Sequence, residues 1–71
     1  MNLKSKSSYI FDEIKKIELL LDRIKKTTAQ VRRMESISNT EMIEKLSIEL
    51  DNNFKRIELI TVSSRNILKG V

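Results

Sequence analysis

Large apolar residues recur at alternating spacings of four and three through the first half of the chain. They are Ile10, Ile14, Ile17, Leu21, Ile24 and Val31, with Thr28 in the one gap. This period places them along one side of an α-helix, where side chains three and four residues apart are neighbours. The chain has no Pro and a single Gly, at position 70, so composition interrupts no helix before the last residues. These features predict a long amphipathic helix.

A second ladder of the same kind occupies the other half of the chain. It consists of Ile43, Leu46, Leu50, Asn53, Ile57, Ile60, Ser64 and Ile67. The two ladders are out of register, because extending the first by heptads from Val31 reaches Met42 rather than Ile43. Thr28 and Asn53 occupy core-type positions, where a polar residue can fix the register of paired helices. The break in register predicts two helices, with one bent continuous helix as the alternative.

A short polar segment, residues 36–39, separates the two ladders. Its side chains compete with the helix for backbone hydrogen bonds, and Ser38 followed by Glu41 has the form of a capping box that starts a helix. We therefore predict an all-α fold, a single module over residues 1–71 with helices over about residues 7–35 and 40–69. Because the link is short, the helices should form an antiparallel two-helix hairpin of coiled-coil type.

Further apolar side chains lie beside or behind the two ladders. Among them are Leu19, Leu20, Ile48, Leu59 and Val62. A lone hairpin would leave them exposed, and contiguous exposed apolar patches usually mark an interface. A two-helix hairpin alone also has little core. We therefore expect these residues to contact another helix or a second copy, which would complete a three- or four-helix bundle.

The net charge of +4 is unevenly distributed. Five bases and no acid occur between Arg23 and Arg33: these two, Lys25, Lys26 and Arg32. They are either a solvated helix face, favoured near a helix C-terminus by the helix dipole, or a basic patch for an acidic protein or anionic lipid. In the second interpretation Arg32 and Arg33 are interaction residues. No aromatic residue interleaves with the bases, so we expect no nucleic-acid partner.

The residue types offer little for catalysis. The chain has no His and no Cys, and no Gly-rich loop that could hold a phosphate. Asp12, Glu13, Glu18 and Asp22 lack the Glu-x-x-His pattern of bundle metal sites. We therefore expect a non-enzymatic protein without cofactor or metal. No stretch approaches the roughly 18–20 uncharged apolar residues that cross a bilayer, so we expect a cytoplasmic protein with at most an indirect membrane contact.

Both predicted helices resemble the first two helices of the N-terminal domain of syntaxin-type SNAREs, an up–down three-helix bundle. In "FDEIKKIELLLDRIKKTTAQVRR" the matching residues are Phe11, Asp12, Glu13, Ile14, Ile17, Leu21, Asp22, Arg23, Ile24, Val31, Arg32 and Arg33. In "ELDNNFKRIEL", similar to the endosomal and trans-Golgi branch, they are Glu49, Leu50, Asn52, Asn53, Phe54, Lys55, Ile57 and Glu58. The resemblance implies a third helix beyond Val71 and a role in vesicle traffic on the cytosolic face of an endomembrane. There the domain would dock tethering or regulatory proteins or restrain a fusion helix.

Two alternatives remain open. "LSIELD" resembles the Ser-x-Glu-Leu-Asp signature of the small Spo0E-like phosphatases, two-helix hairpins that act on a response regulator. That resemblance would carry over Ser47, Glu49, Leu50 and Asp51, although the usual Gln of the signature is Ile48 here. The other alternative is a self-associating hairpin that forms a four-helix dimer, with an unknown role such as bacterial or phage regulation.

Overall fold

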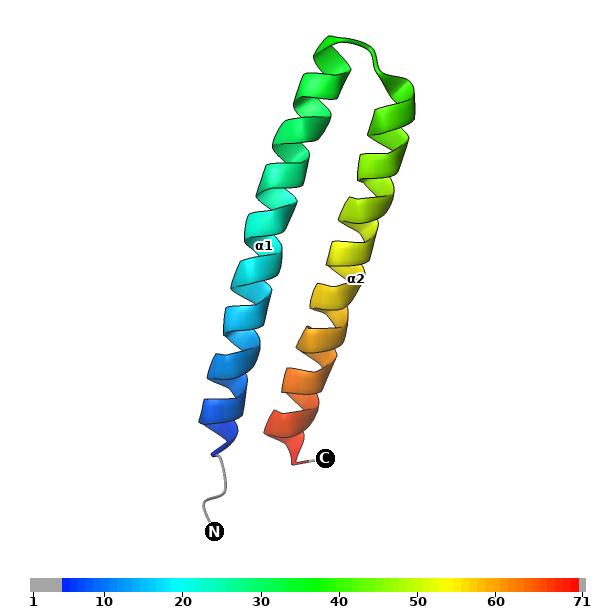
Figure 1. Ribbon diagram of the computed structural model, residues 1–71. Helices are drawn as coiled ribbons and strands as arrows, with labels where there is room; N and C mark the ends of the chain where they lie inside the picture. The colour runs from blue at the N-terminus through cyan, green and yellow to red at the C-terminus, as the bar shows by residue number, and fades with distance from the viewer. Residues whose placement is uncertain (1–4, 71) are drawn as a thin grey trace.

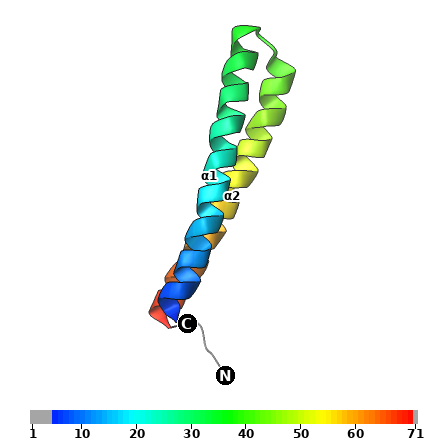
Figure 2. The same ribbon diagram turned by 60° about the vertical axis from the view of Figure 1, so that its left-hand side comes forward.

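The computed structural model of the protein describes residues 5–70 and consists of two helices joined by a short turn (Figure 1). Helix α1 spans Lys6–Ser36 and helix α2 spans Thr40–Lys69. The helices run side by side in opposite directions, and the start of α1 and the end of α2 lie at the same end of a rod of 56 × 17 × 15 Å (Figures 1 and 2). The predicted all-α antiparallel hairpin is confirmed, and the single bent helix is wrong. The first four residues and Val71, which the sequence assigned to the module, lie outside the described residues.

Local interactions explain why each helix is long and uninterrupted. The Ser5 hydroxyl oxygen caps α1 by accepting a hydrogen bond from the Ser8 N–H at 3.2 Å. Within residues 5–70, four ion pairs join residues of the same helix, namely Glu13–Lys16, Asp22–Lys26, Glu41–Lys45 and Asp51–Lys55. Pairs of this kind contribute about 0.3–0.5 kcal/mol each to a helix. They stabilise the helices themselves and do not select the partner helix.

The turn begins with a Schellman motif at the end of α1. The Ser38 N–H donates to the Glu35 carbonyl at 3.1 Å, and the Asn39 N–H donates to the Met34 carbonyl at 2.9 Å. Ser38 itself has φ = +56°, a left-handed conformation that usually falls to Gly. These bonds fix the rotation of the last turn of α1 relative to the chain that leaves it.

Asn39 starts the second helix. Its side-chain Oδ1 accepts a hydrogen bond from the Met42 N–H at 3.1 Å, and its carbonyl accepts one from the Ile43 N–H at 3.1 Å. The predicted capping box of Ser38 with Glu41 is therefore wrong. Ser38 has the left-handed conformation that ends α1, so the helix-starting role moves to the next residue.

The contact row of α1 differs in part from the predicted ladder. It consists of Ile10, Glu13, Ile17, Leu20, Ile24, Thr27, Val31 and Met34, which are buried or half-buried, and Asp12 is half-buried beside it. The predicted residues Ile10, Ile17, Ile24 and Val31 lie in this row, whereas the predicted residues Ile14, Leu21 and Thr28 are exposed. The Schellman turn explains the difference, because it directs Met34 rather than Glu35 toward α2. Heptad steps back from Met34 reach Leu20 and not Leu21.

The contact row of α2 is the predicted ladder. All eight of its residues, from Ile43 to Ile67, are buried or half-buried. Counting outward from the turn pairs Met34 with Ile43 and Ile24 with Asn53. We refer to the two contact rows together as the seam.

The seam encloses a thin core. Leu20, Ile24 and Leu46 are the buried hydrophobic residues, joined by polar Thr27 and Asn53, and no side chain between residues 5 and 70 is fully buried. The accessible surface is 5878 Å². A compact monomer of 8.3 kDa would expose about 4,600 Å². The hairpin thus exposes roughly 1,300 Å² more than a compact protein of its mass.

Candidate interaction surfaces

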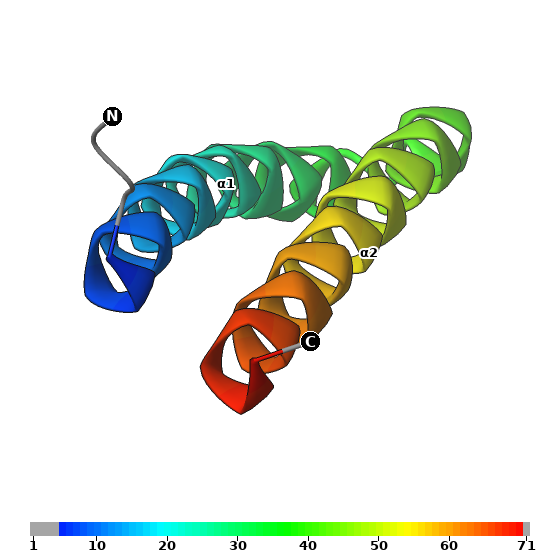
Figure 3. The same cartoon turned by 90° about the horizontal axis from the view of Figure 1, so that it is seen from below.

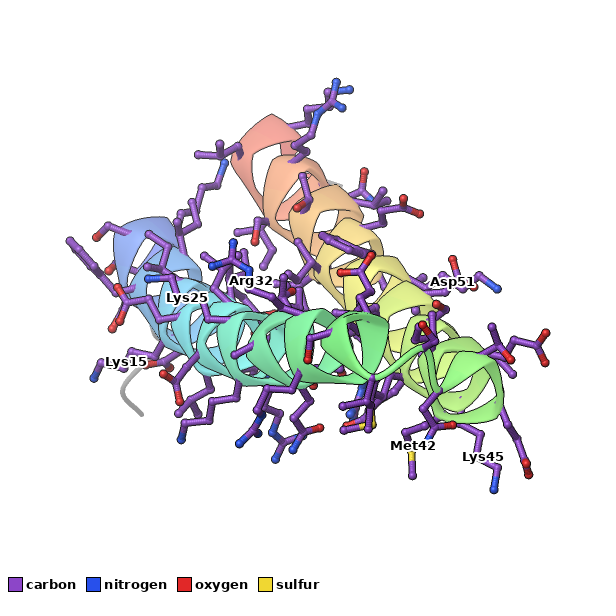
Figure 4. All side chains as sticks on the ribbon, turned by 90° about the horizontal axis from the view of Figure 1, so that it is seen from above. Lys15, Lys25, Arg32, Met42, Lys45 and Asp51 are labelled. Atoms are coloured by element: carbon purple, nitrogen blue, oxygen red, sulfur yellow. The ribbon has the colours of Figure 1, made fainter. Side chains whose placement is uncertain are left out.

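The seam separates two long faces of the hairpin, and each face is built from residues of both helices. Figure 4 views the molecule along its length and labels residues of both faces. Lys25 and Arg32 lie on the upper side of α1 in this view, whereas Met42 lies on the lower side of α2. Figure 3 shows the two helices from the opposite end. The faces have different chemistry and are described in turn.

A shallow groove runs between the helices on the face that contains Met42. Three adjoining depressions form it, and the middle one shares Arg23 with one neighbour and Gln30 with the other. The charged residues that line it are Lys16, Arg23, Lys26, Arg33, Arg56 and Glu49. Five of these six are cations. We call this surface the cationic groove. Its floor is formed by seam residues such as Leu20, Leu46 and Ile60.

The cationic groove takes only part of the basic run that the sequence shows. Lys26 and Arg33 line the groove, but Lys25 and Arg32 do not. The helical period of about 100° per residue separates each adjacent pair. The structure thus divides the predicted basic patch of Arg32 and Arg33 between two faces. Sequence reasoning missed Arg56, whose membership becomes visible only once the seam of α2 is placed opposite that of α1.

The opposite face carries large apolar side chains. They are Phe11, Ile14, Leu21, Phe54 and Leu68, which are between 40% and 65% exposed. Ile14 and Leu21 each follow a seam residue of α1, and Phe54 and Leu68 each follow a seam residue of α2, so the period places all four on the side away from the groove. We call these five residues the apolar strip. The sequence placed Ile14 and Leu21 in the seam, and their exposure follows from the rotation of α1 set by the turn.

Three hydroxyl residues lie in the same rows as the apolar strip. Thr28, Ser47 and Thr61 donate to the carbonyl oxygens four residues earlier, at 2.7, 2.7 and 2.9 Å. Their hydroxyl hydrogens therefore have acceptors within their own helix. A partner could cover this face without leaving those donors unsatisfied, which would otherwise cost about 1–3 kcal/mol for each buried group.

The five apolar residues that the sequence assigned to an interface differ in exposure and in position. Leu20 is 7% exposed and belongs to the seam, so its assignment to a contact with another chain is wrong. The shift of the α1 contact row is the reason. Leu19, Ile48, Leu59 and Val62 are exposed. They do not form one surface, because Leu19 lines the cationic groove while Ile48 and Val62, two heptads apart, lie on the back of α2.

The residues that resemble the phosphatase signature do not converge. The Ser47 hydroxyl donates to the Ile43 carbonyl, and Leu50 is half-buried in the seam. Glu49 lines the cationic groove, whereas Asp51 points away from α1 (Figure 4). Asp51 forms an ion pair with Lys55 at 2.9 Å, and the hydrogen bond to this carboxylate raises the pKa of Lys55.

Comparison of the chain with protein-family models, curated proteins and solved structures returns no match. Within residues 5–70, neither helix is long and apolar enough to span a membrane. The same part of the chain contains no cluster of three or more acidic residues that could hold a metal ion. The structure defines an all-α helical hairpin with one cationic and one apolar face.

Proposed function

We propose that this protein is a non-enzymatic helical interaction module that completes a helix bundle through its apolar strip. The observation that supports this is the strip itself, which runs along both helices. The hydroxyl side chains between its apolar residues already donate hydrogen bonds to backbone carbonyls of their own helix. Fully burying a Leu, Ile or Phe side chain contributes about 1.5–3 kcal/mol. Covering five such residues, each about half exposed, therefore supplies several kcal/mol for binding a helical partner.

The chain allows a clean test of this proposal because it contains no Cys. A single Cys is introduced on the strip as Leu21→Cys, or on the back of α1 as Lys15→Cys, which is labelled in Figure 4. The rate of thiol modification is then measured in the purified protein and in a lysate of its source cells. We expect the strip Cys to react at least about tenfold more slowly than the control wherever a partner covers the strip. A strip Cys that reacts as fast as the control Cys in the purified protein and also in the lysate would contradict the proposal.

A specific form of this function follows the syntaxin-type resemblance. In this form a third helix covers the apolar strip, and the module regulates a fusion helix or docks tethering proteins on the cytosolic face of an endomembrane. The test is to mix the protein with a fusion-helix peptide of a syntaxin-type SNARE and measure binding by fluorescence anisotropy. Binding that Leu21→Asp abolishes and Lys15→Asp preserves would support this form. Absence of binding would remove this form while leaving the general interaction module intact.

The phosphatase alternative retains one supporting feature, which is the two-helix hairpin that both have in common. Its test is the loss of aspartyl-phosphate from a phosphorylated response regulator in the presence of the protein. Asp51→Asn should abolish any such activity, while Asp22→Asn is the matched control because Asp22 also forms an exposed ion pair within its helix. No hydrolysis by the wild-type protein would remove this alternative.

A further inference from the structure

We propose that the partner of the apolar strip is the same strip of a second copy, so that two hairpins form a four-helix dimer with both turns at one end. This inference rests on the proposed function, since it names the partner of the same surface. Three observations carry it: the size of the surplus surface, the geometry of the hairpin and the charges that border the strip.

The surplus surface has the size of a protein interface. Each hairpin exposes roughly 1,300 Å² more than a compact protein of its mass. Stable interfaces bury about 800 Å² per partner. A second copy on the strip could thus bury a standard interface and still leave the cationic groove of each hairpin open on the outside.

The geometry of the hairpin fixes the register of such a dimer. A two-fold axis parallel to the helices turns one strip onto the other and places α1 over the partner's α2. The facing helices are antiparallel, as in an up–down four-helix bundle. Because rotation about this axis allows no sliding along it, residues at equal distance from the turn face each other. The residues of α1 and α2 that lie at the same height within one hairpin therefore also lie at the same height between the two protomers.

The charges that border the strip agree with this register. The bordering row of α1 contains Glu18, Lys25 and Arg32, and that of α2 contains Glu44, Asp51 and Glu58. Counting from the turn places Arg32 opposite the partner's Glu44 and Lys25 opposite the partner's Asp51. Glu18 falls opposite the partner's Glu58, so each half of the dimer gains two attractive pairs and one repulsive pair. Lys25, Arg32 and Glu44 are exposed and take part in none of the four ion pairs within the helices.

A dimer with the turns at opposite ends would lack these pairs. There α1 lies over the partner's α1, so Arg32 can no longer face the partner's Glu44. The bordering acids of α2 would then face one another, with Asp51 near the partner's Glu58. The position of the charges thus distinguishes the two arrangements.

The test uses two charge-reversed variants of the whole chain, K25E/R32E and E44K/D51K, studied by sedimentation equilibrium. Each variant alone turns its attractive pairs into repulsive ones, so we expect its dimer dissociation constant to rise at least about tenfold. An equimolar mixture restores opposite charges at every reversed position and should dimerise like the wild-type protein. The control is R23E/R33E, which makes the same change in net charge on the cationic groove and should leave the dimer intact.

Several outcomes would overturn the inference. A mixture that stays monomeric, or a control that weakens the dimer as much as K25E/R32E, excludes the proposed register. A wild-type protein that is monomeric at high micromolar concentration excludes the second copy. If the strip Cys is nevertheless protected in the lysate, the interaction module stands and its partner is a different protein. If that Cys is unprotected everywhere, both proposals fail.

A second measurement applies even if a charge-reversed variant loses its helix content in circular dichroism. Arg32→Cys and Glu44→Cys are prepared as separate proteins, mixed and oxidised. The dimer with turns at one end brings these two positions together, so the mixed disulfide should form in preference to either symmetric one. A mixed disulfide that forms no more readily than either symmetric one would contradict the inference.

Discussion

The cationic groove and the apolar strip are built from the same two helices and border the same seam, yet their chemistry is opposite. The groove is lined by five cations and one acid, whereas the strip presents five large apolar side chains. Leu20 and Leu21 illustrate how narrow the boundary is, because one is 7% and the other 44% exposed. A rotation of α1 by one residue would exchange these roles. The rotation of the helices, more than their composition, therefore decides what each face can bind.

The largest expected effect is on the free energy of unfolding, and it should differ between the neighbours Leu20 and Leu21. Leu20→Ala removes a buried side chain from a thin core and should lower the free energy of unfolding by about 2–3 kcal/mol. Leu21→Ala removes a partly exposed side chain and should lower the same quantity by less than about 1 kcal/mol within the hairpin. Urea denaturation at a protein concentration low enough to keep the protein monomeric measures both. Equal effects would show that the two leucines do not belong to different surfaces.

The second effect concerns Asn53, which is 6% exposed and also lines the cationic groove. Replacing it with Leu exchanges a buried polar group for an apolar one and should raise the free energy of unfolding by about 1–2 kcal/mol. A polar seam residue also restricts the alignment of paired helices. We therefore expect Asn53→Leu to be more stable but less uniform, with broader amide resonances in NMR. Greater stability with unchanged line widths would mean that Asn53 does not define the two faces.

The third effect tests the turn that sets the rotation of α1. Asn39→Ala removes the cap of α2 and should destabilise the hairpin by about 1 kcal/mol. Ser38→Gly relieves a left-handed residue at φ = +56° and should stabilise the hairpin by several tenths of a kcal/mol up to about 1 kcal/mol. Thermal unfolding followed by circular dichroism measures both. Destabilisation by Ser38→Gly would contradict the Schellman geometry.

These residues also show how far the sequence alone could go. Periodicity and the polar segment predicted the two helices to within one residue at each end, and the α2 ladder predicted its whole contact row. The α1 ladder was wrong at Ile14 and Leu21. The predicted row and the observed row have every seventh residue in common, and apolar residues occur in both, so the sequence pattern alone could not distinguish them. The turn decides between them, and its conformation depends on a left-handed Ser38 that no propensity favours. The apolar strip and the membership of Arg56 in the groove follow from that rotation, so neither could be predicted without it.

The smallest expected effect concerns the cationic groove alone. Arg56 and Lys16 line the same depression from different helices, so their charges repel each other across the groove. Arg56→Glu should replace this repulsion with attraction and raise the free energy of unfolding by a few tenths of a kcal/mol at low salt. Added salt screens exposed charges, so it should stabilise the wild-type protein slightly and reduce the advantage of the variant. Urea denaturation at low and high salt measures both trends, with Arg65→Glu as the control because Arg65 lies outside the groove. An equal gain from the control would attribute the effect to net charge and not to the groove.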